Sequence, residues 1–181
     1  MQTITIVTGN PGKVRELEAM AGGKLDFAMR KLDLPEIQSM DLEEVVKDKL
    51  QRAFEQVKGP VIVDDVSAGL ENLKGLPGPF IKFFNETLGQ SALYQLAGNK
   101  EGRATVHCIA AYYDGQTMLL GNGQIDCTVV APRGTNGFGF DTVLIPDGQA
   151  KTMGEMTDAE KMQISHRGRA FRDLLQQLKD L

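Results

Sequence analysis

The first thirty residues switch from a strand pattern to a helix pattern and back. Residues 3–7, "TITIV", alternate and are rich in β-branched side chains, which predicts a strand. After a turn, the apolar positions follow helical spacing as far as Gly22, where a glycine pair predicts the helix end. Residues 24–29 alternate again. We therefore expect a strand, a helix and a second strand at the start of the chain.

The strongest helix pattern covers residues 42–57, where apolar side chains recur at i, i+3, i+4 and i+7. Asp41 precedes it, with Glu44 three positions later, which resembles a capping box. The short run "VIV" at 61–63 is wholly apolar, a pattern typical of a strand that is buried on both faces.

The second half of the chain reads mainly as strands. We expect a short helix near 80–88, a hairpin of strands 104–113 and 118–130 around "DGQT", a strand at 141–145, and a terminal helix with an apolar stripe at Leu174, Leu175, Leu178 and Leu181. Early βα units followed by a hairpin predict an α/β domain with a mixed sheet.

Composition narrows the class of protein. The 181 residues are 41% hydrophobic and 24% charged, which fits one globular domain spanning 1–181. The net charge of −4 comes without a basic run, so we expect no nucleic-acid partner. Nothing resembles a membrane span or a signal peptide. Cys108 and Cys127 fall in strand-like stretches and are expected to be buried hydrophobes, consistent with a reducing, cytoplasmic setting.

The stretch "TGNPGK" at 8–13 is the first candidate for chemistry. A strand that turns through glycines into a helix presents backbone N–H groups to anions, and Lys13 adds a positive charge on what we expect to be a surface turn. The spacing of the phosphate-binding P-loop and that of the dinucleotide fingerprint are both absent. Turn chemistry alone explains the glycines and the proline, so taken by itself the stretch favours a plain turn between strand and helix over a phosphate site.

Paired acids are the second candidate. Asp64 and Asp65 follow the apolar strand, and ligands gather at the carboxyl ends of strands in open α/β sheets. Carboxylates there suit Mg²⁺, although Asp is also common in solvated turns. Glu36 is a candidate third acid. Lys49 lies on the apolar face of its helix, where it either reaches the protein edge or faces an anion.

Two further clusters lie near the C-terminus. The segment "NGFGFDTVLIP" at 136–146 carries Phe138, on which a base could stack, and Phe140, although burial habits favour the core for both rings. The segment "EKMQISHRGRAF" at 160–171 gathers basic side chains around one of the two histidines. The other histidine, His107, lies in mid-strand and is expected to be structural.

Taken together, these motifs resemble the inosine triphosphate pyrophosphatase family, which hydrolyses deaminated purine nucleoside triphosphates. The matching pieces occur in the family's order along nearly the whole chain: "TGNPGK", "LPE", "VDD", "GLPGPFIKFF", "APRG", "GFGFD", "GEM" and "EKMQISHRG". The resemblance implies conversion of ITP, dITP and XTP to monophosphate and pyrophosphate, which would keep these bases out of DNA and RNA. It also implies an elongated mixed sheet flanked by helices, two lobes around a nucleotide cleft, and a homodimer.

The resemblance also assigns roles to residues. Those expected to hold the triphosphate are Thr8, Gly9, Asn10, Lys13, Lys49 and Lys82, with Lys13 also catalytic. Glu36, Asp64 and Asp65 would hold Mg²⁺, with Mn²⁺ as an alternative, and Asp65 would activate water. The base would stack on Phe138 against a wall of Gly139, Phe140 and Asp141, with Lys161, His166 and Arg167 at the base and ribose edge.

Two departures from the family pattern are visible. Val66 stands where many members carry a hydroxyl residue, with Ser67 next, and Met162 replaces the usual Asn. Neither removes a predicted metal ligand or a phosphate-binding lysine, so activity is still expected. Two rival interpretations are a diphosphatase for modified pyrimidine nucleotides, and a nucleotide-binding module without catalysis. The base-side motifs argue against the first, and the intact acid cluster argues against the second.

Overall fold

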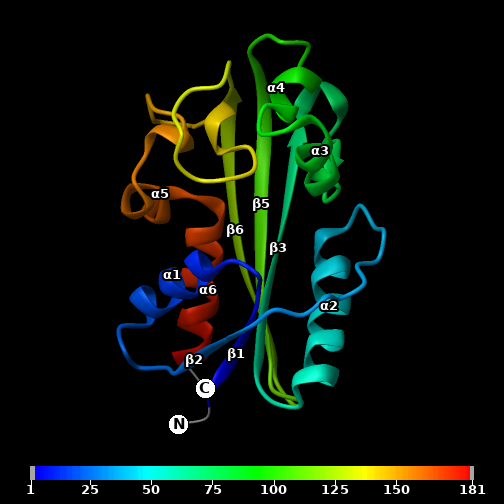
Figure 1. Ribbon diagram of the computed structural model, residues 1–181, viewed down its shortest axis with the longest axis vertical. Helices are drawn as coiled ribbons and strands as arrows, with labels where there is room; N and C mark the ends of the chain where they lie inside the picture. The colour runs from blue at the N-terminus through cyan, green and yellow to red at the C-terminus, as the bar shows by residue number, and fades with distance from the viewer. Residues whose placement is uncertain (1–2, 180–181) are drawn as a thin grey trace. The chain divides into compact units, whose positions relative to one another are not determined.

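The computed structural model describes residues 3–179 (Figure 1). Contacts within the chain divide it into two compact units. The first unit contains the described residues of Met1–Asp65, Ile109–Asn122 and Ala170–Leu181. The second contains Val66–Cys108 and Gly123–Arg169. None of the helices in the described part combines the length and the apolar character needed to cross a lipid bilayer.

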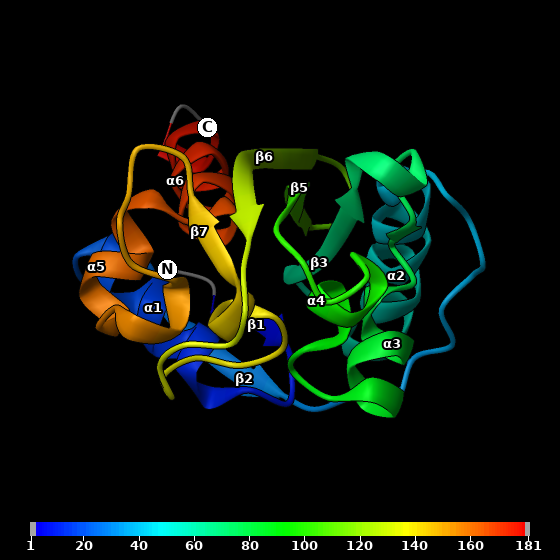
Figure 2. The same cartoon turned by 90° about the horizontal axis from the view of Figure 1, so that it is seen from above.

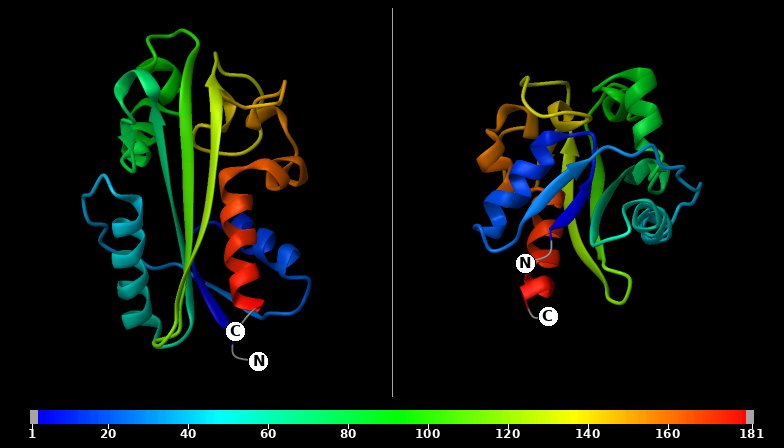
Figure 3. Two further views of the ribbon diagram at one scale, coloured as in Figure 1. Left: turned by 180° about the vertical axis from the view of Figure 1, so that it is seen from behind. Right: turned by 60° about the horizontal axis from the view of Figure 1, so that its bottom comes forward.

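Seven strands form one mixed sheet in the order β2-β1-β3-β5-β6-β7, with β4 paired to β3. Their bounds are β1 Ile4–Val7, β2 Phe27–Arg30, β3 Val61–Leu70, β4 Pro77–Gly78, β5 Gly102–Tyr113, β6 Met118–Val129 and β7 Leu144–Pro146. β1 is parallel to both β2 and β3, while β4 and β7 are antiparallel to their neighbours. Figure 3 shows β1 and β2 side by side. The predicted mixed α/β sheet is confirmed.

The helices flank this sheet. They are α1 Pro11–Ala21, α2 Leu42–Val57, α3 Ile81–Leu88, α4 Ala92–Leu96, α5 Asp158–Ile164 and α6 His166–Lys179, with short 3-10 turns at Glu71–Leu73, Asp141–Val143 and Met153–Glu155. The predictions of helices at 42–57 and near 80–88 are confirmed. Gly22 caps α1 in the left-handed conformation that its sequence position suggested.

Each unit has its own apolar core. In the first, the buried face of α2, with Val46, Leu50 and Ala53, packs against β1, β3 and β5. Figure 2 shows α1 and α2 on opposite sides of β1. In the second, α3 and α4 pack with buried side chains of β3, β5 and β6, and both cysteines are buried as expected.

Three local predictions need correction, and one cannot be compared with the structure. The strand at 61–63 does not stop at the acids but continues to Leu70, because alternate residues such as Ala68 and Leu70 enter the second core. The second strand is Phe27–Arg30 rather than 24–29. The segment 141–145 opens as a 3-10 turn and becomes a strand only at Leu144. Leu181, the end of the predicted stripe, lies outside the described residues.

The predicted capping box of α2 is also partly wrong, because Glu44 does not pair with Asp41. Asp41 does cap the helix, since its Oδ1 accepts a hydrogen bond from the N–H of Glu43 at 2.9 Å. Glu44, however, accepts from the hydroxyl of Ser39 at 2.6 Å instead of reaching the backbone of Asp41. The Asp41 N–H donates instead to Ser39 Oγ. Ser39 therefore takes the place that the sequence pattern predicted for Glu44.

Candidate functional site

The opening turn connects β1 to α1 and is held by its own side chains. Thr8 Oγ1 accepts from the N–H of Asn10 at 3.1 Å, and Asn10 Oδ1 accepts from the N–H of Gly12 at 2.8 Å. Asn10 is therefore the N-cap of α1. Each contact uses the acceptor oxygen of the side chain. The hydroxyl hydrogen of Thr8 and the amide hydrogens of Asn10 are the groups that suit an anion.

Lys13 does not lie on an open surface turn as the sequence suggested. Its side chain is 17% exposed, and its ammonium donates to both oxygens of Asp64, at 2.7 and 2.8 Å. The Asp64 side chain is 3% exposed, so this is a nearly buried ion pair. It joins α1 to β3 and fixes the lysine at the carboxyl end of β1.

Lys49 occupies the centre of the second charged group. Its ammonium donates to Glu36 Oε1 at 2.9 Å and to Asp65 Oδ2 at 3.1 Å. Burial opposes the charged form of Lys49, but the carboxylates of Asp65 and then Glu36 outweigh it and hold the pKa above its usual range. The sequence left open whether Lys49 reaches the protein edge or faces an anion. In the structure it is partly buried and faces the carboxylates of Glu36 and Asp65.

The three predicted metal-binding acids are therefore divided between two lysines. Asp64 and Asp65 are neighbours within β3, and successive side chains of a strand point to opposite faces of a sheet. Over residues 3–179, no group of three or more His, Cys, Asp or Glu side chains could hold a metal. Glu36 and Asp65 still direct carboxylate oxygens at one cation, the ammonium of Lys49. Carboxylate oxygens are the ligands that Mg²⁺ prefers.

The second unit contains the predicted base-binding side chains. Phe138 is 40% exposed, whereas Phe140 is 7% exposed and belongs to the apolar core. The Phe140 side chain thus lies in the core, as burial habits suggested, and its part in the wall stays a prediction, while Phe138 is exposed enough for stacking. Lys161 Nζ lies 5.1 Å and Arg167 Cζ 4.9 Å from the centroid of the Phe138 ring.

Asp141 organises this loop from inside. It is 5% exposed, and its Oδ2 accepts from the N–H of Phe138 at 2.9 Å and from Lys161 Nζ at 3.1 Å. A Cβ atom on Gly137, which has a φ of +78°, would lie 2.1 Å from the same oxygen. The glycine is required because the loop winds closely around this carboxylate.

Lys161, His166 and Arg167 are brought together by the junction of α5 and α6. All three are buried, with exposures of 7%, 4% and 8%. The His166 ring lies 6.0 Å from that of Phe140. The structure thus places Lys161 and Arg167 beside Phe138, and His166 beside Phe140. Lys82 lies in the first turn of α3 and is exposed.

Sequence reasoning missed one neighbour of this loop. Asn85 of α3 places its Nδ2 3.4 Å from the Cβ position of Gly139, and its Oδ1 is buried with no hydrogen-bond partner among the described residues. The available signal was an amide side chain directly after Phe83 and Phe84.

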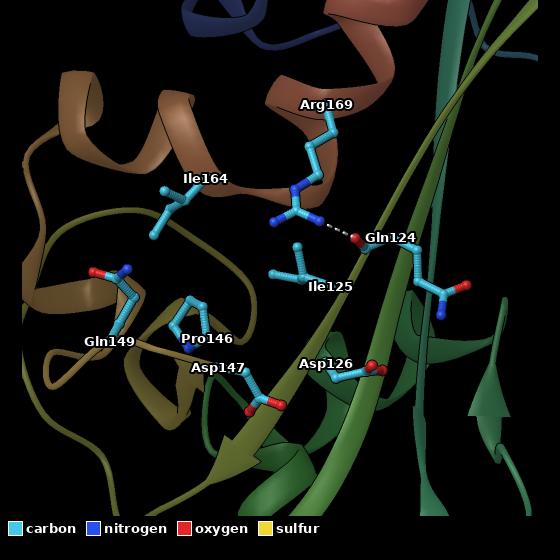
Figure 4. A pocket seen from close by; sticks show the side chains of 8 residues that line it. All are labelled: Gln124, Ile125, Asp126, Pro146, Asp147, Gln149, Ile164 and Arg169. Carbon is cyan, nitrogen blue, oxygen red and sulfur yellow. Dashed lines mark hydrogen bonds between the residues drawn. The ribbon is translucent and has the colours of Figure 1, made fainter.

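A separate cavity of about 280 Å³ lies elsewhere in the second unit (Figure 4). Arg169 borders it and donates to the carbonyl oxygen of Gln124 at 2.9 Å. The family resemblance assigns none of the residues that line this cavity to the substrate. They are Gln124, Ile125, Asp126, Pro146, Asp147, Gln149, Ile164 and Arg169.

Comparison with known proteins extends over nearly the whole chain. The chain is 40% identical to an inosine triphosphate pyrophosphatase of Emericella nidulans, covering 99% of this chain and 98% of that protein. It is 38% identical to a dITP/XTP pyrophosphatase of Thermococcus kodakarensis, covering 98% and 97%. The fold matches a Ham1 protein of Staphylococcus aureus with a TM-score of 0.83, 25% identity and 99% coverage of both chains. The model of the Ham1 family matches residues 4–177, and the chain therefore belongs to the Ham1 family.

Proposed function

We propose that this protein hydrolyses deaminated purine nucleoside triphosphates, ITP, dITP and XTP, to the monophosphate and pyrophosphate. The observation that carries the proposal is the full-length similarity to relatives named for this activity. The cluster around Lys49 and the basic side chains around Phe138 supply residues for the two halves of such a substrate. The cellular role would be to clear these nucleotides from the cytoplasmic pool.

The reaction adds a water oxygen to the α-phosphorus and breaks the bond from that phosphorus to the oxygen bridging the α- and β-phosphates. Asp65 would accept the hydrogen bond of the attacking water and take up its proton. Lys13 and Lys49 would stabilise negative charge on the departing pyrophosphate. No covalent intermediate is required.

Mg²⁺, with Mn²⁺ as an alternative, is the proposed cofactor, and Glu36 and Asp65 are the residues that would hold it. When bound, such an ion neutralises charge on phosphate oxygens. Binding would require Lys49 to release at least one of the two carboxylates, because its ammonium lies between them. Asp64 is assigned instead to positioning Lys13. The active form is proposed to be a homodimer.

Selectivity for the base follows from hydrogen-bond chemistry. Hypoxanthine and xanthine carry an acceptor at position 6, where adenine carries a donor. Lys161, His166 and Arg167 form a donor-rich group, and an adenine amino group facing it would leave donors unpaired at a cost of about 1–3 kcal/mol each. Guanine shares the 6-oxo group, so it must be refused at its 2-amino group.

The decisive experiment is pyrophosphate release measured as kcat/KM for ITP, dITP, XTP, GTP, ATP and the pyrimidine triphosphates, with and without Mg²⁺. We expect the three deaminated substrates to be used far better than ATP and the pyrimidines, and GTP to be used poorly. Equal use of ATP and ITP would reject the proposed selectivity. Preference for a modified pyrimidine would support the rival diphosphatase, and binding without turnover would support the non-catalytic module.

A further inference from the structure

The charge at the phosphate end of the first unit is incompletely balanced for a triphosphate. Both lysines there are committed to acids: Lys13 to Asp64, and Lys49 to Glu36 and Asp65. Two positive and three negative side chains leave this cluster with one net negative charge. The side chains of this cluster alone would therefore repel a polyanion, and positive charge must be added, by the proposed Mg²⁺ and by any further cation that adjoins the turn.

Strand register brings such a cation to the turn. β1 and β2 are parallel, and Val7 pairs with Arg30 as the last residue of each strand. The N–H of Thr8 donates to the carbonyl oxygen of Arg30 at 3.1 Å, so the pairing extends one residue past β1. Lys31, which follows Arg30, therefore emerges at the same sheet edge as the "TGNPGK" turn. In α/β sheets this carboxyl edge is where ligands bind.

The side chain of Lys31 lies along that turn. Its Cγ, Cδ and Cε atoms are 3.8, 3.7 and 3.7 Å from the position that a Cβ atom on Gly9 would take. The alkyl stem thus packs against the glycine backbone, and the ammonium lies one bond beyond Cε. Among the residues that the structure describes, none forms an ion pair with Lys31, unlike Lys13 and Lys49.

We propose that Lys31 is a further phosphate-binding residue, whose ammonium contacts the triphosphate chain of the bound nucleotide at the Gly9 turn. This inference rests on the proposed function. Lys31 is exposed and is not held by an acid, so it can follow the phosphates through the reaction. Such a contact strengthens substrate and transition state alike, and its loss raises KM while leaving kcat nearly unchanged.

The test compares Lys31→Gln and Lys31→Arg with a matched control, Lys24→Gln. Lys24 lies in the same unit and is exposed, but it follows the C-terminal end of α1, about 15 Å along the helix from the turn. We expect Lys31→Gln to raise the KM for ITP about tenfold with kcat within about twofold of wild type. Lys31→Arg should retain most of the affinity, and Lys24→Gln should behave as wild type.

A second readout does not need turnover. Inorganic tripolyphosphate binding, measured by calorimetry without added metal, should weaken about tenfold in Lys31→Gln and stay unchanged in Lys24→Gln. Unchanged KM and unchanged tripolyphosphate affinity in a folded Lys31→Gln protein would overturn the inference, as would a fall in kcat alone. If wild-type protein released no pyrophosphate from ITP, the proposed function would fail, and the tripolyphosphate comparison would still decide the role of Lys31.

Discussion

At the scale of single residues, the charged side chains of the first unit form ion pairs with one another, in addition to the binding role proposed for them. The sequence marked Lys13, Lys49, Asp64 and Asp65 by their places next to a turn, a helix face and a strand. It did not reveal their pairing, because ion pairs between residues 51 positions apart, as for Lys13 and Asp64, or 16 apart, as for Lys49 and Asp65, depend on how the elements pack. Asp64 illustrates this: read as a metal ligand, it lies 2.7 Å from Lys13 with a 3% exposed side chain.

Replacement of Lys13 by Ala should lower the free energy of unfolding. It leaves the buried carboxylate of Asp64 without its cation, a change that costs on the order of 3 kcal/mol. The measurement is urea denaturation followed by circular dichroism. Adding Asp64→Asn to the variant should restore part of the stability without restoring activity. If Lys13→Ala alone were as stable as wild type, the ion pair would have no structural role.

Replacement of Asp65 by Asn should reduce turnover of ITP by about 10² or more at saturating Mg²⁺, the scale of losing a positioned base or metal ligand. The matched control is Asp48→Asn, which removes an acid from α2 that pairs only with Arg52 among the contacts described for it. Control turnover should equal that of wild type. Near-normal turnover in Asp65→Asn would remove Asp65 from the proposed mechanism.

At the scale of elements, the predicted helices and the β5–β6 hairpin were correct because their signals are local. Periodicity and end signals fix α1 and α2 without reference to the rest of the chain. β3 was predicted too short because its second half is buried by another core, which no local pattern reports. Phe138 and Phe140 share one motif, and only tertiary packing separates the exposed ring from the buried one.

The α5–α6 junction offers a test of positioning. A Cβ atom on Gly168 would lie 1.9 Å from the carbonyl oxygen of Met162, so the first turn of α6 could not keep its place. Gly168→Ala should lower the melting temperature and reduce kcat/KM for ITP, because Lys161 and Arg167 flank this contact. The matched control is Gly59→Ala, where nothing lies within 4 Å of the added Cβ. Loss of stability in both variants alike would count against a specific clash.

At the scale of the whole molecule, the two units carry different parts of the proposed recognition. The phosphate-side residues Lys13, Lys49 and Asp65 belong to the first unit, and Phe138 and Arg167 belong to the second. The sequence predicted both groups through motifs that lie far apart along the chain. Only the structure shows that the two groups belong to separate units, because the strands β3, β5 and β6 each contribute residues to both units.

This division predicts two distinguishable classes of variant. Arg167→Gln should lower the ratio of kcat/KM for ITP over ATP by about tenfold, since it removes a donor from the base side. Lys49→Gln should lower kcat/KM for both nucleotides by a similar factor, since every triphosphate presents the same phosphates. The measurement is the ITP-to-ATP ratio in each variant. A changed ratio in Lys49→Gln with an unchanged ratio in Arg167→Gln would reverse the assignment.

The continuity of β3 has a consequence for how this chain tolerates changes in length. Asp65 closes one unit's segment and Val66 opens the other's, with no loop between them. Deleting or inserting a single residue there would turn every following side chain of the strand to the opposite face, moving Ala68 and Leu70 out of their core. The turn at residues 114–117 lies between the two strands of the hairpin, so an insertion there would disturb the hydrogen bonds of Asp114 to the N–H groups of Gln116 and Thr117 but would not turn the side chains of a continuous strand. A protein with one residue inserted in the hairpin turn should therefore fold, whereas one with a residue inserted between Asp65 and Val66 should not. The number of residues in β3 on either side of that bond is fixed by the two cores.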